Sequence, residues 1–188
     1  MRRDVAQLSD EALLEAVADS DEAALGELYD RFGRVAYGLA LRILRDASLA
    51  EDAVQEAFLQ AWRSAGSYRP QRAKASTWLL TFVHRRAVDL VRREERRRVE
   101  PTEALADPAG PGADEEAVRG SRRQVVRDAL EALPSEQRQA LELAYYGGLT
   151  QSELAERLGE PLGTIKSRMF TGLQRLRALL DEAGFELA

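Results

Sequence analysis

Cysteine is absent from this chain of 188 residues, and histidine occurs only once, at His84. These absences exclude disulfides and thiolate metal sites, argue against a transition-metal centre, and fit a reducing compartment. The chain also has no long apolar run, so it contains neither a recognisable signal peptide nor a stretch that could span a bilayer. We therefore expect a cytoplasmic protein that does not insert directly into a membrane.

Strand patterns and enzyme motifs are missing as well. No segment alternates apolar and polar residues as a half-buried strand does. There is no glycine-rich phosphate loop, and no nucleophile pattern accompanies the single histidine. With 45% hydrophobic and 31% charged residues, the composition is that of a globular protein. We therefore expect an all-α protein that is not an enzyme and that uses no cofactor or metal.

The net charge of −5 is distributed unevenly along the chain. Residues 1–68 carry 7 basic and 13 acidic groups, whereas residues 69–98 carry 10 basic and 3 acidic groups. Residues 99–118 carry 6 acidic groups and no base, and residues 119–188 carry 10 of each sign. An acidic total thus hides a segment with a net charge of +7 at residues 69–98, which predicts one surface for nucleic acid and other surfaces for other partners.

Residues 99–118 divide the chain into two parts. This segment is rich in proline, glycine, alanine and acidic residues, so it cannot bury a core. We interpret it as a flexible acidic linker between two small helical domains at residues 1–98 and 119–188. Composition alone fits a passive tether as well as it fits a linker whose charge has a function.

The first domain is predicted to be a run of helices. They are expected from Ser9 to Asp19, from Asp21 to Arg45, from about Ser48 to Gly66, and from Ala75 to Arg98. The third begins with a predicted capping box of Ser48 and Glu51. One face of this third helix carries a stripe at i, i+3, i+4, i+7 and i+8, made of Asp52, Gln55, Glu56, Leu59 and Gln60. Taken alone, the stripe is most simply read as a solvated helix face.

The last helix of this domain and the loop before it combine basic and aromatic side chains. The candidate nucleic-acid contacts are Tyr68, Arg69, Arg72, Lys74, Trp78, His84, Arg85, Arg86, Arg92 and Arg93. Arginine forks bind phosphates, and Tyr68 and Trp78 can offer faces on which unpaired bases stack. The combination is typical of single-stranded nucleic-acid binding. The plainer alternatives are core packing for Trp78 and a solvated position for His84.

Residues 149–173 have the pattern of a helix-turn-helix. Thr150 and Glu153 form a capping box that starts a short helix. Gly159 permits the positive φ of the turn, and Pro161 presets φ for a new helix. That helix is expected to pack inward through Leu162, Ile165, Met169, Leu173 and Leu176. The candidate DNA contacts are Gln151, Arg157, Thr164, Lys166, Ser167, Arg168, Phe170 and Thr171. Such a helix suits the major groove, and a plain helical hairpin is the alternative.

Three stretches, at residues 50–58, 78–89 and 133–168, together carry a resemblance to a known family. In this order they resemble the extracytoplasmic-function sigma factors, small two-domain initiation factors of bacterial RNA polymerase. The resemblance covers roughly residues 20–98 and 119–182. The helix-turn-helix alone is shared with many regulators, whereas the joint order of the three stretches is much more specific.

The resemblance implies a role for each surface. The stripe from Asp52 to Gln60 would bind the clamp helices of the β′ subunit of core RNA polymerase, which reverses its interpretation as a solvated face. The loop at residues 67–74, with the following helix, would recognise and open the −10 promoter element. The helix at residues 164–171 would read the −35 element. Further implied partners are the β flap of polymerase and an anti-sigma factor, which can be membrane-anchored. The acidic linker would thread the RNA-exit path.

The chain departs from the family pattern at three places. The −10 loop lacks the Arg-Gly pair that many members have, His84 stands where asparagine is commoner, and Thr171 stands where many members have arginine. The promoter sequence, the regulon and the inducing signal are not readable from these residues. The alternative function is a helix-turn-helix regulator of the LuxR type that acts as a dimer without entering polymerase. Such a protein usually has an α/β receiver domain, of which the sequence shows no sign.

Overall fold

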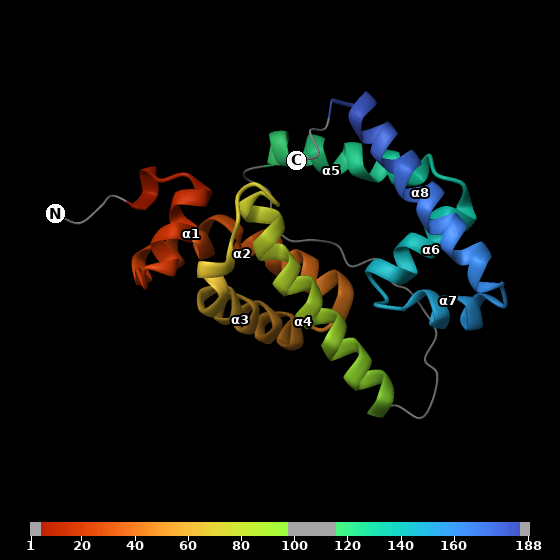
Figure 1. Ribbon diagram of the computed structural model, residues 1–188, viewed down its shortest axis with the longest axis horizontal. Helices are drawn as coiled ribbons and strands as arrows, with labels where there is room; N and C mark the ends of the chain where they lie inside the picture. Colours follow the sequence, from red (N-terminus) through yellow and green to blue (C-terminus); the bar gives the residue numbers. More distant parts are fainter. Residues whose placement is uncertain (1–4, 98–115, 185–188) are drawn as a thin grey trace. The chain divides into compact units, whose positions relative to one another are not determined.

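The computed structural model describes residues 5–97 and 116–184, and within these ranges every regular element is a helix (Figure 1). The all-α prediction is therefore confirmed. The chain divides into two compact units, Met1–Ala109 and Gly110–Ala188. The predicted linker lies outside the described residues except at residues 116–118, which form the start of a helix instead of linker. None of the helices in the described ranges has the length and hydropathy of a membrane span.

The first unit is built around three long helices. Its elements are η1 (Val5–Gln7), α1 (Asp10–Ala18), α2 (Glu22–Leu44), α3 (Ala47–Ser64), η2 (Ala65–Ser67) and α4 (Ala75–Arg97). The helices α2, α3 and α4 pack pairwise against one another, and α1 contacts all three of them as well as η2. Leu28, Phe58 and Leu79, one from each long helix, are buried in the shared core. The arrangement leaves one face of α3 and one face of α4 outside the core.

Side-chain caps fix where the helices of this unit begin. Ser9 and Asp21, at which the first two helices were predicted to begin, accept backbone N–H bonds at the starts of α1 and α2. The predicted capping box at Ser48 is wrong. The carboxylate of Asp46 caps α3 instead, with its Oδ1 accepting from the amide of Leu49 at 2.9 Å. Because α3 starts at Ala47, Ser48 already lies in its first turn.

Arg31 on α2 ties the N-terminal elements to the three-helix core. Its guanidinium donates to the carboxylates of Glu27 and Asp10 at 2.7 and 2.9 Å and to the backbone carbonyls of Leu8 and Ala6 at 2.9 Å each. The bond to Glu27 is the main cause of a raised pKa of Arg31, followed by the bond to Asp10. These contacts hold α1 against α2 and so place α1 beside η2.

The second unit is a four-helix assembly centred on its last helix. Its elements are α5 (Glu116–Glu131), α6 (Ser135–Tyr145), α7 (Gln151–Leu158) and α8 (Leu162–Glu182), and α8 packs on the other three. Leu154 on α7 and Ile165 on α8 are fully buried. Part of the predicted inward face of α8 is wrong, because Leu162 and Leu173 are 38% and 55% exposed.

Gly172 explains the shifted face of α8. It is buried, and a Cβ added to it would lie 3.2 Å from Gln137 Cβ and 3.2 Å from Leu141 Cδ1, both on α6. The two helices therefore approach closely at a residue without a side chain. This contact, together with Ile165 and Leu180, selects the line of α8 that faces the core and turns Leu173 outward.

Candidate nucleic-acid interface and partner surface

The predicted stripe on α3 lies fully on the outside of the first unit. All five members, Asp52, Gln55, Glu56, Leu59 and Gln60, are exposed, while Ala53, Val54, Ala57, Phe58 and Ala61 bury the opposite face. Leu59 is a large apolar side chain that leaves 53% of its surface open to solvent. A single exposed leucine is normal on a protein surface, so the surroundings of Leu59 decide whether this face suits a partner.

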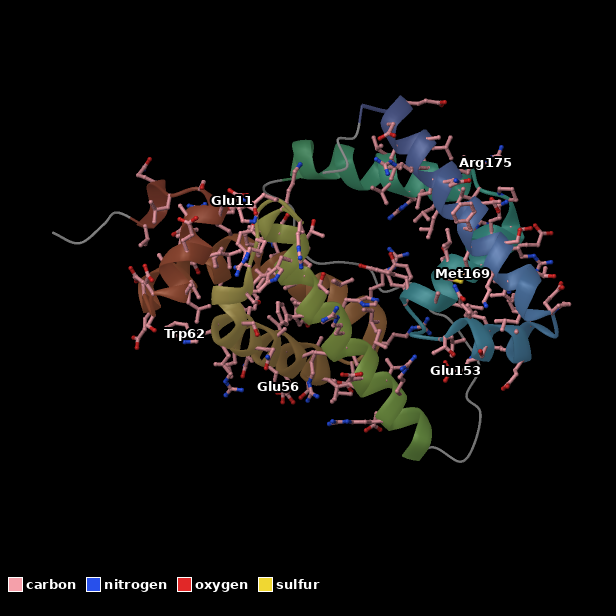
Figure 2. The ribbon with its side chains drawn as sticks, viewed as in Figure 1. Glu11, Glu56, Trp62, Glu153, Met169 and Arg175 are labelled. Carbon is pink, nitrogen blue, oxygen red and sulfur yellow. The ribbon has the colours of Figure 1, made fainter. Side chains whose placement is uncertain are left out.

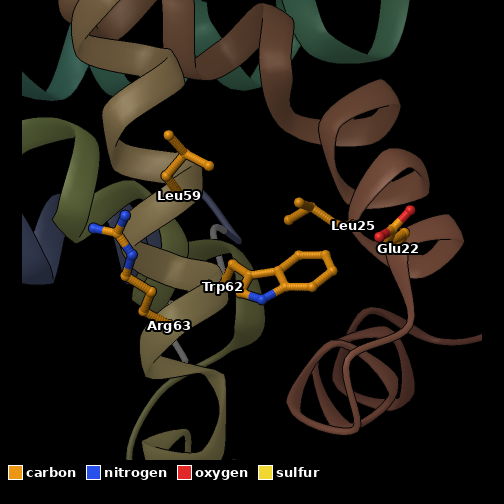
Figure 3. A pocket seen from close by; sticks show the side chains of 5 residues that line it. All are labelled: Glu22, Leu25, Leu59, Trp62 and Arg63. Atoms are coloured by element: carbon orange, nitrogen blue, oxygen red, sulfur yellow. The ribbon is translucent and has the colours of Figure 1, made fainter.

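The stripe continues into a hollow between α2 and α3 (Figure 3). Glu22 and Leu25 line the α2 side, and Leu59, Trp62 and Arg63 line the α3 side. Trp62 is only half-buried, and its ring reaches across toward Leu25. The apolar end of the stripe is therefore wider than the single exposed leucine that the sequence indicated.

Glu56 forms an ion pair with Arg86 on α4, so the stripe contacts the basic helix directly (Figure 2 labels Glu56). The Glu56 side chain is 54% exposed, whereas that of Arg86 is only 22% exposed. Arg86 was predicted as a nucleic-acid contact. The structure places Arg86 in this interhelical pair, where Glu56 partly compensates its charge, and its contact with nucleic acid stays a prediction.

The loop before α4 is held by its own hydrogen bonds. Tyr68, predicted to offer a stacking face, is 6% exposed, and its hydroxyl donates to the carbonyl of Ala73 at 3.0 Å. The Arg69 guanidinium donates to the carbonyls of Gly66 and Tyr68 at 2.9 and 2.7 Å. This position corrects the prediction for Tyr68, because a buried ring cannot receive a base. The exposed cations of the loop are Arg69, Arg72 and Lys74.

Helix α4 presents a mixed face beyond the loop. Trp78 is half-buried and makes edge-to-face contacts with Tyr68 and Phe82, with ring centroids 5.5 and 4.7 Å apart. Part of the Trp78 ring is therefore packed in the unit, and the rest is open to solvent. Arg85 and Arg93 are exposed, and His84 and Arg92 are half-buried. The structure thus brings the cations of the loop and of α4 onto adjoining elements of one unit.

The helix-turn-helix forms in the second unit with the predicted local signals. Thr150 Oγ1 accepts from the amide of Glu153 at 3.2 Å, and the Glu153 carboxylate accepts from the amide of Thr150 at 2.6 Å (Figure 2 labels Glu153). Gly159 ends α7 in the left-handed region with φ 64°. Pro161 precedes the first residue of α8 instead of occupying it. The turn and both helices are therefore confirmed.

Helix α8 displays most of its predicted DNA contacts. Lys166, Ser167, Phe170 and Thr171 are exposed, as are Gln151 and Arg157 on α7, and Thr164 is half-buried. Phe170 is 63% exposed, the highest value among the large apolar side chains in the described ranges. Apolar side chains in this position can contact thymine methyl groups in a major groove. The outer face of α8 thus combines a cation, hydroxyls and one aromatic ring.

Two of these residues also support the helix. Arg168 donates to the Glu160 carboxylate at 2.8 Å, across the turn between α7 and α8. The Thr171 hydroxyl donates to the carbonyl of Ser167 at 2.8 Å and accepts from Gln137 on α6 at 3.3 Å. Glu160 and Gln137 were not found from the sequence, because neither stands at a spacing that links it to its partner.

Comparison with known proteins matches both units to one family. Sigma-70 region 2 matches residues 28–97, and sigma-70 region 4 matches residues 129–178. Over 174 residues the chain is 45% identical to the ECF RNA polymerase sigma factor SigK of Mycobacterium tuberculosis, covering 91% of this chain and 93% of that protein. The SigK of Mycobacterium ulcerans is 42% identical over 173 residues, covering 90% and 92%. The solved structure of Rhodobacter sphaeroides SigE in complex with the anti-sigma ChrR is 33% identical, with 90% of this chain and 97% of that chain covered and a TM-score of 0.45.

Proposed function

The chain belongs to the extracytoplasmic-function sigma factors of bacterial RNA polymerase, and from this premise we propose how its surfaces divide the work of promoter recognition. The protein binds core RNA polymerase through the first unit, and it recognises the two promoter elements with separate surfaces on its two units. It carries out no chemistry of its own, because polymerase supplies the catalysis. We place it in the cytoplasm, where its proposed partner acts.

The stripe on α3 is the proposed contact for the β′ clamp helices. Its exposed polar side chains surround Leu59, and the adjoining hollow adds apolar surface from Leu25 and Trp62. An apolar centre within a polar rim is the usual construction of a protein–protein contact. Because the chain belongs to this family, we also propose that the second unit binds the β flap of polymerase.

The loop at residues 67–74 and helix α4 form the proposed −10 surface. The exposed cations Arg69, Arg72, Lys74, Arg85 and Arg93 bind the phosphates, and the open part of Trp78 faces the unpaired bases. Opening the duplex and turning a base out of the stack costs a few kcal/mol, which these contacts offset. Arg86 contributes less directly, because it is paired with Glu56.

Helix α8 is the proposed reader of the −35 element in the major groove. Lys166, Ser167 and Phe170 lie on its exposed face and are the proposed contacts to the bases. Gln151 and Arg157 are exposed on α7 and are the proposed contacts to the DNA phosphates. The two units bind DNA modestly by themselves and more tightly when joined, since each raises the effective concentration of the other. The acidic linker, which is residues 99–115 once the start of α5 is left out, is proposed to run along the RNA-exit path.

An anti-sigma factor is the proposed regulator. One solved relative is described in complex with the anti-sigma ChrR. A partner of this kind would cover the DNA-binding surfaces of both units, and anchoring of that partner in a membrane is part of the proposal. The dimeric regulator of the LuxR type is not favoured, because both units match sigma-70 regions.

The match of the two units to regions 2 and 4, in this order, is the observation that carries the proposal. A binding titration against core RNA polymerase tests it. The double variant Gln55→Ala/Leu59→Ala changes the stripe without touching the Glu56–Arg86 pair, and it is expected to weaken binding more than about tenfold. Glu15→Ala, an exposed carboxylate on α1, is the matched control. Unchanged binding by the stripe variant would remove the clamp assignment.

A further inference from the structure

Tyr68 is a buried residue of the loop at residues 67–74, which carries the exposed cations of the first unit before α4. Its side chain is 6% exposed, and its hydroxyl reaches across the loop to the carbonyl of Ala73 at 3.0 Å. The bond joins the residue before the turn at residues 69–72 to the residue after it. The hydrogen bond of this one phenol hydroxyl therefore joins the two ends of the turn.

The packing around the ring holds this phenol in place. Trp78 on α4 meets the ring edge-on at a centroid distance of 5.5 Å, and Tyr68 belongs to the buried core of the unit. Burial raises the pKa of Tyr68, and the carboxylates of Glu11 and Asp10 on α1 raise it further. A phenol is already protonated at neutral pH, so the hydroxyl is a donor there, and the raised pKa extends this state to higher pH.

The turn above the phenol carries the cations of the loop. The amide of Arg72 donates to the carbonyl of Arg69 at 3.0 Å, and the Arg69 guanidinium donates to two carbonyls at the loop's entrance. Arg69, Arg72 and Lys74 are all exposed. These three cations therefore lie on or next to the turn at residues 69–72, whose two ends are joined by the hydrogen bond from Tyr68 to Ala73.

We propose that Tyr68 is a positioning residue for the −10 element: through its bond to Ala73 it holds the turn at residues 69–72 in the shape that presents Arg72 and Lys74 to single-stranded DNA. The inference rests on the proposed function and adds a residue that does not itself touch DNA. A loop that is ordered before binding loses less conformational freedom when it binds, so its contacts yield more affinity. Without the phenol hydroxyl, the same cations would have to be ordered by the DNA.

The test compares the Tyr68→Phe variant with the unmodified chain, each at full length and assembled with core RNA polymerase. Phenylalanine keeps the packed ring and removes only the hydroxyl. The expected result is an affinity about 3- to 10-fold weaker for a forked template with a single-stranded −10 element, and an unchanged affinity for the −35 duplex. Tyr37→Phe removes a half-buried phenol hydroxyl from α2 and is the matched control, with no expected change on either template.

Amide hydrogen exchange gives a second readout, which a general loss of stability would not mimic. Tyr68→Phe is expected to speed exchange at residues 69–74 while leaving exchange in α2 and α3 unchanged. Faster loop exchange with unchanged forked-template affinity would overturn the proposal, because loop order would then not matter for DNA binding. Equal losses of affinity on both templates would also overturn it, since the effect would not be local to the loop.

A second variant keeps the proposal testable if Tyr68→Phe fails to fold. Ala73→Gly loosens the backbone at the accepting residue and leaves the aromatic core intact. It is expected to weaken forked-template binding selectively, and unchanged binding by this variant would contradict the proposal. Failure of the unmodified holoenzyme to bind the forked template would refute the proposed function itself, which is a different outcome from a failure of Tyr68 alone.

Discussion

The ion pair between Glu56 and Arg86 predicts a measurable coupling between α3 and α4. The two side chains are 54% and 22% exposed, so the pair is neither fully solvated nor buried. Exposed pairs contribute roughly 0.2–1 kcal/mol, and breaking a buried pair costs about 3–5 kcal/mol. For this partly screened pair we expect a coupling free energy of about 1 kcal/mol, toward the exposed end of that scale.

A double-mutant cycle with Glu56→Gln and Arg86→Gln isolates this quantity. The assay is urea unfolding of the full-length chain followed by tryptophan fluorescence. The chain has only two tryptophans, Trp62 and Trp78, and both lie in the first unit, so the signal reports that unit alone. A parallel cycle of Gln55→Ala with Arg86→Gln should be additive. A coupling below about 0.3 kcal/mol, which is the usual additivity error, would show that the Glu56–Arg86 pair does not couple α3 to α4.

The remaining predictions concern the DNA surfaces. Thr150→Val removes the side-chain oxygen of the capping box of α7 and should destabilise the second unit by about 1 kcal/mol. Circular dichroism should show a lower unfolding midpoint, and an unchanged midpoint would count against a stabilising role of the cap. Arg85→Ala should weaken open-complex formation more than −35 duplex binding, measured by permanganate footprinting and duplex titration, and equal losses would contradict the division of surfaces. Arg157→Ala should lower the magnitude of the slope of log affinity against log salt on −35 duplex by about 1, because Arg157 is proposed to meet a phosphate, and an unchanged slope would contradict that placement.

The helix-turn-helix was predictable because each of its signals acts over a few residues. Thr150, Glu153 and Gly159 specify a cap, a helix and a turn through contacts with their immediate neighbours. The same holds for the caps at Ser9 and Asp21. Asp46 was missed because the capping-box pattern of Ser48 and Glu51 indicated a later start, whereas the extended backbone at Asp46 begins α3 at Ala47.

The site residues that sequence patterns misplaced depend on distant packing. Tyr68 is buried where its ring meets Trp78 of α4, just after η2, which packs against α1 from far earlier in the chain. Leu173 is exposed because the close approach at Gly172 sets the rotation of α8 on α6. Periodicity identifies an amphipathic helix but not the exact line that faces its neighbours.

Transcription by core RNA polymerase on a library of promoter fragments is the decisive measurement of whether the chain directs promoter-specific initiation. With the purified chain present, we expect discrete start sites that share two upstream elements. These start sites should disappear with the stripe variant Gln55→Ala/Leu59→Ala. Transcription that is independent of the chain, together with salt-dependent duplex binding by a dimer, would contradict the account and favour a regulator that never enters polymerase.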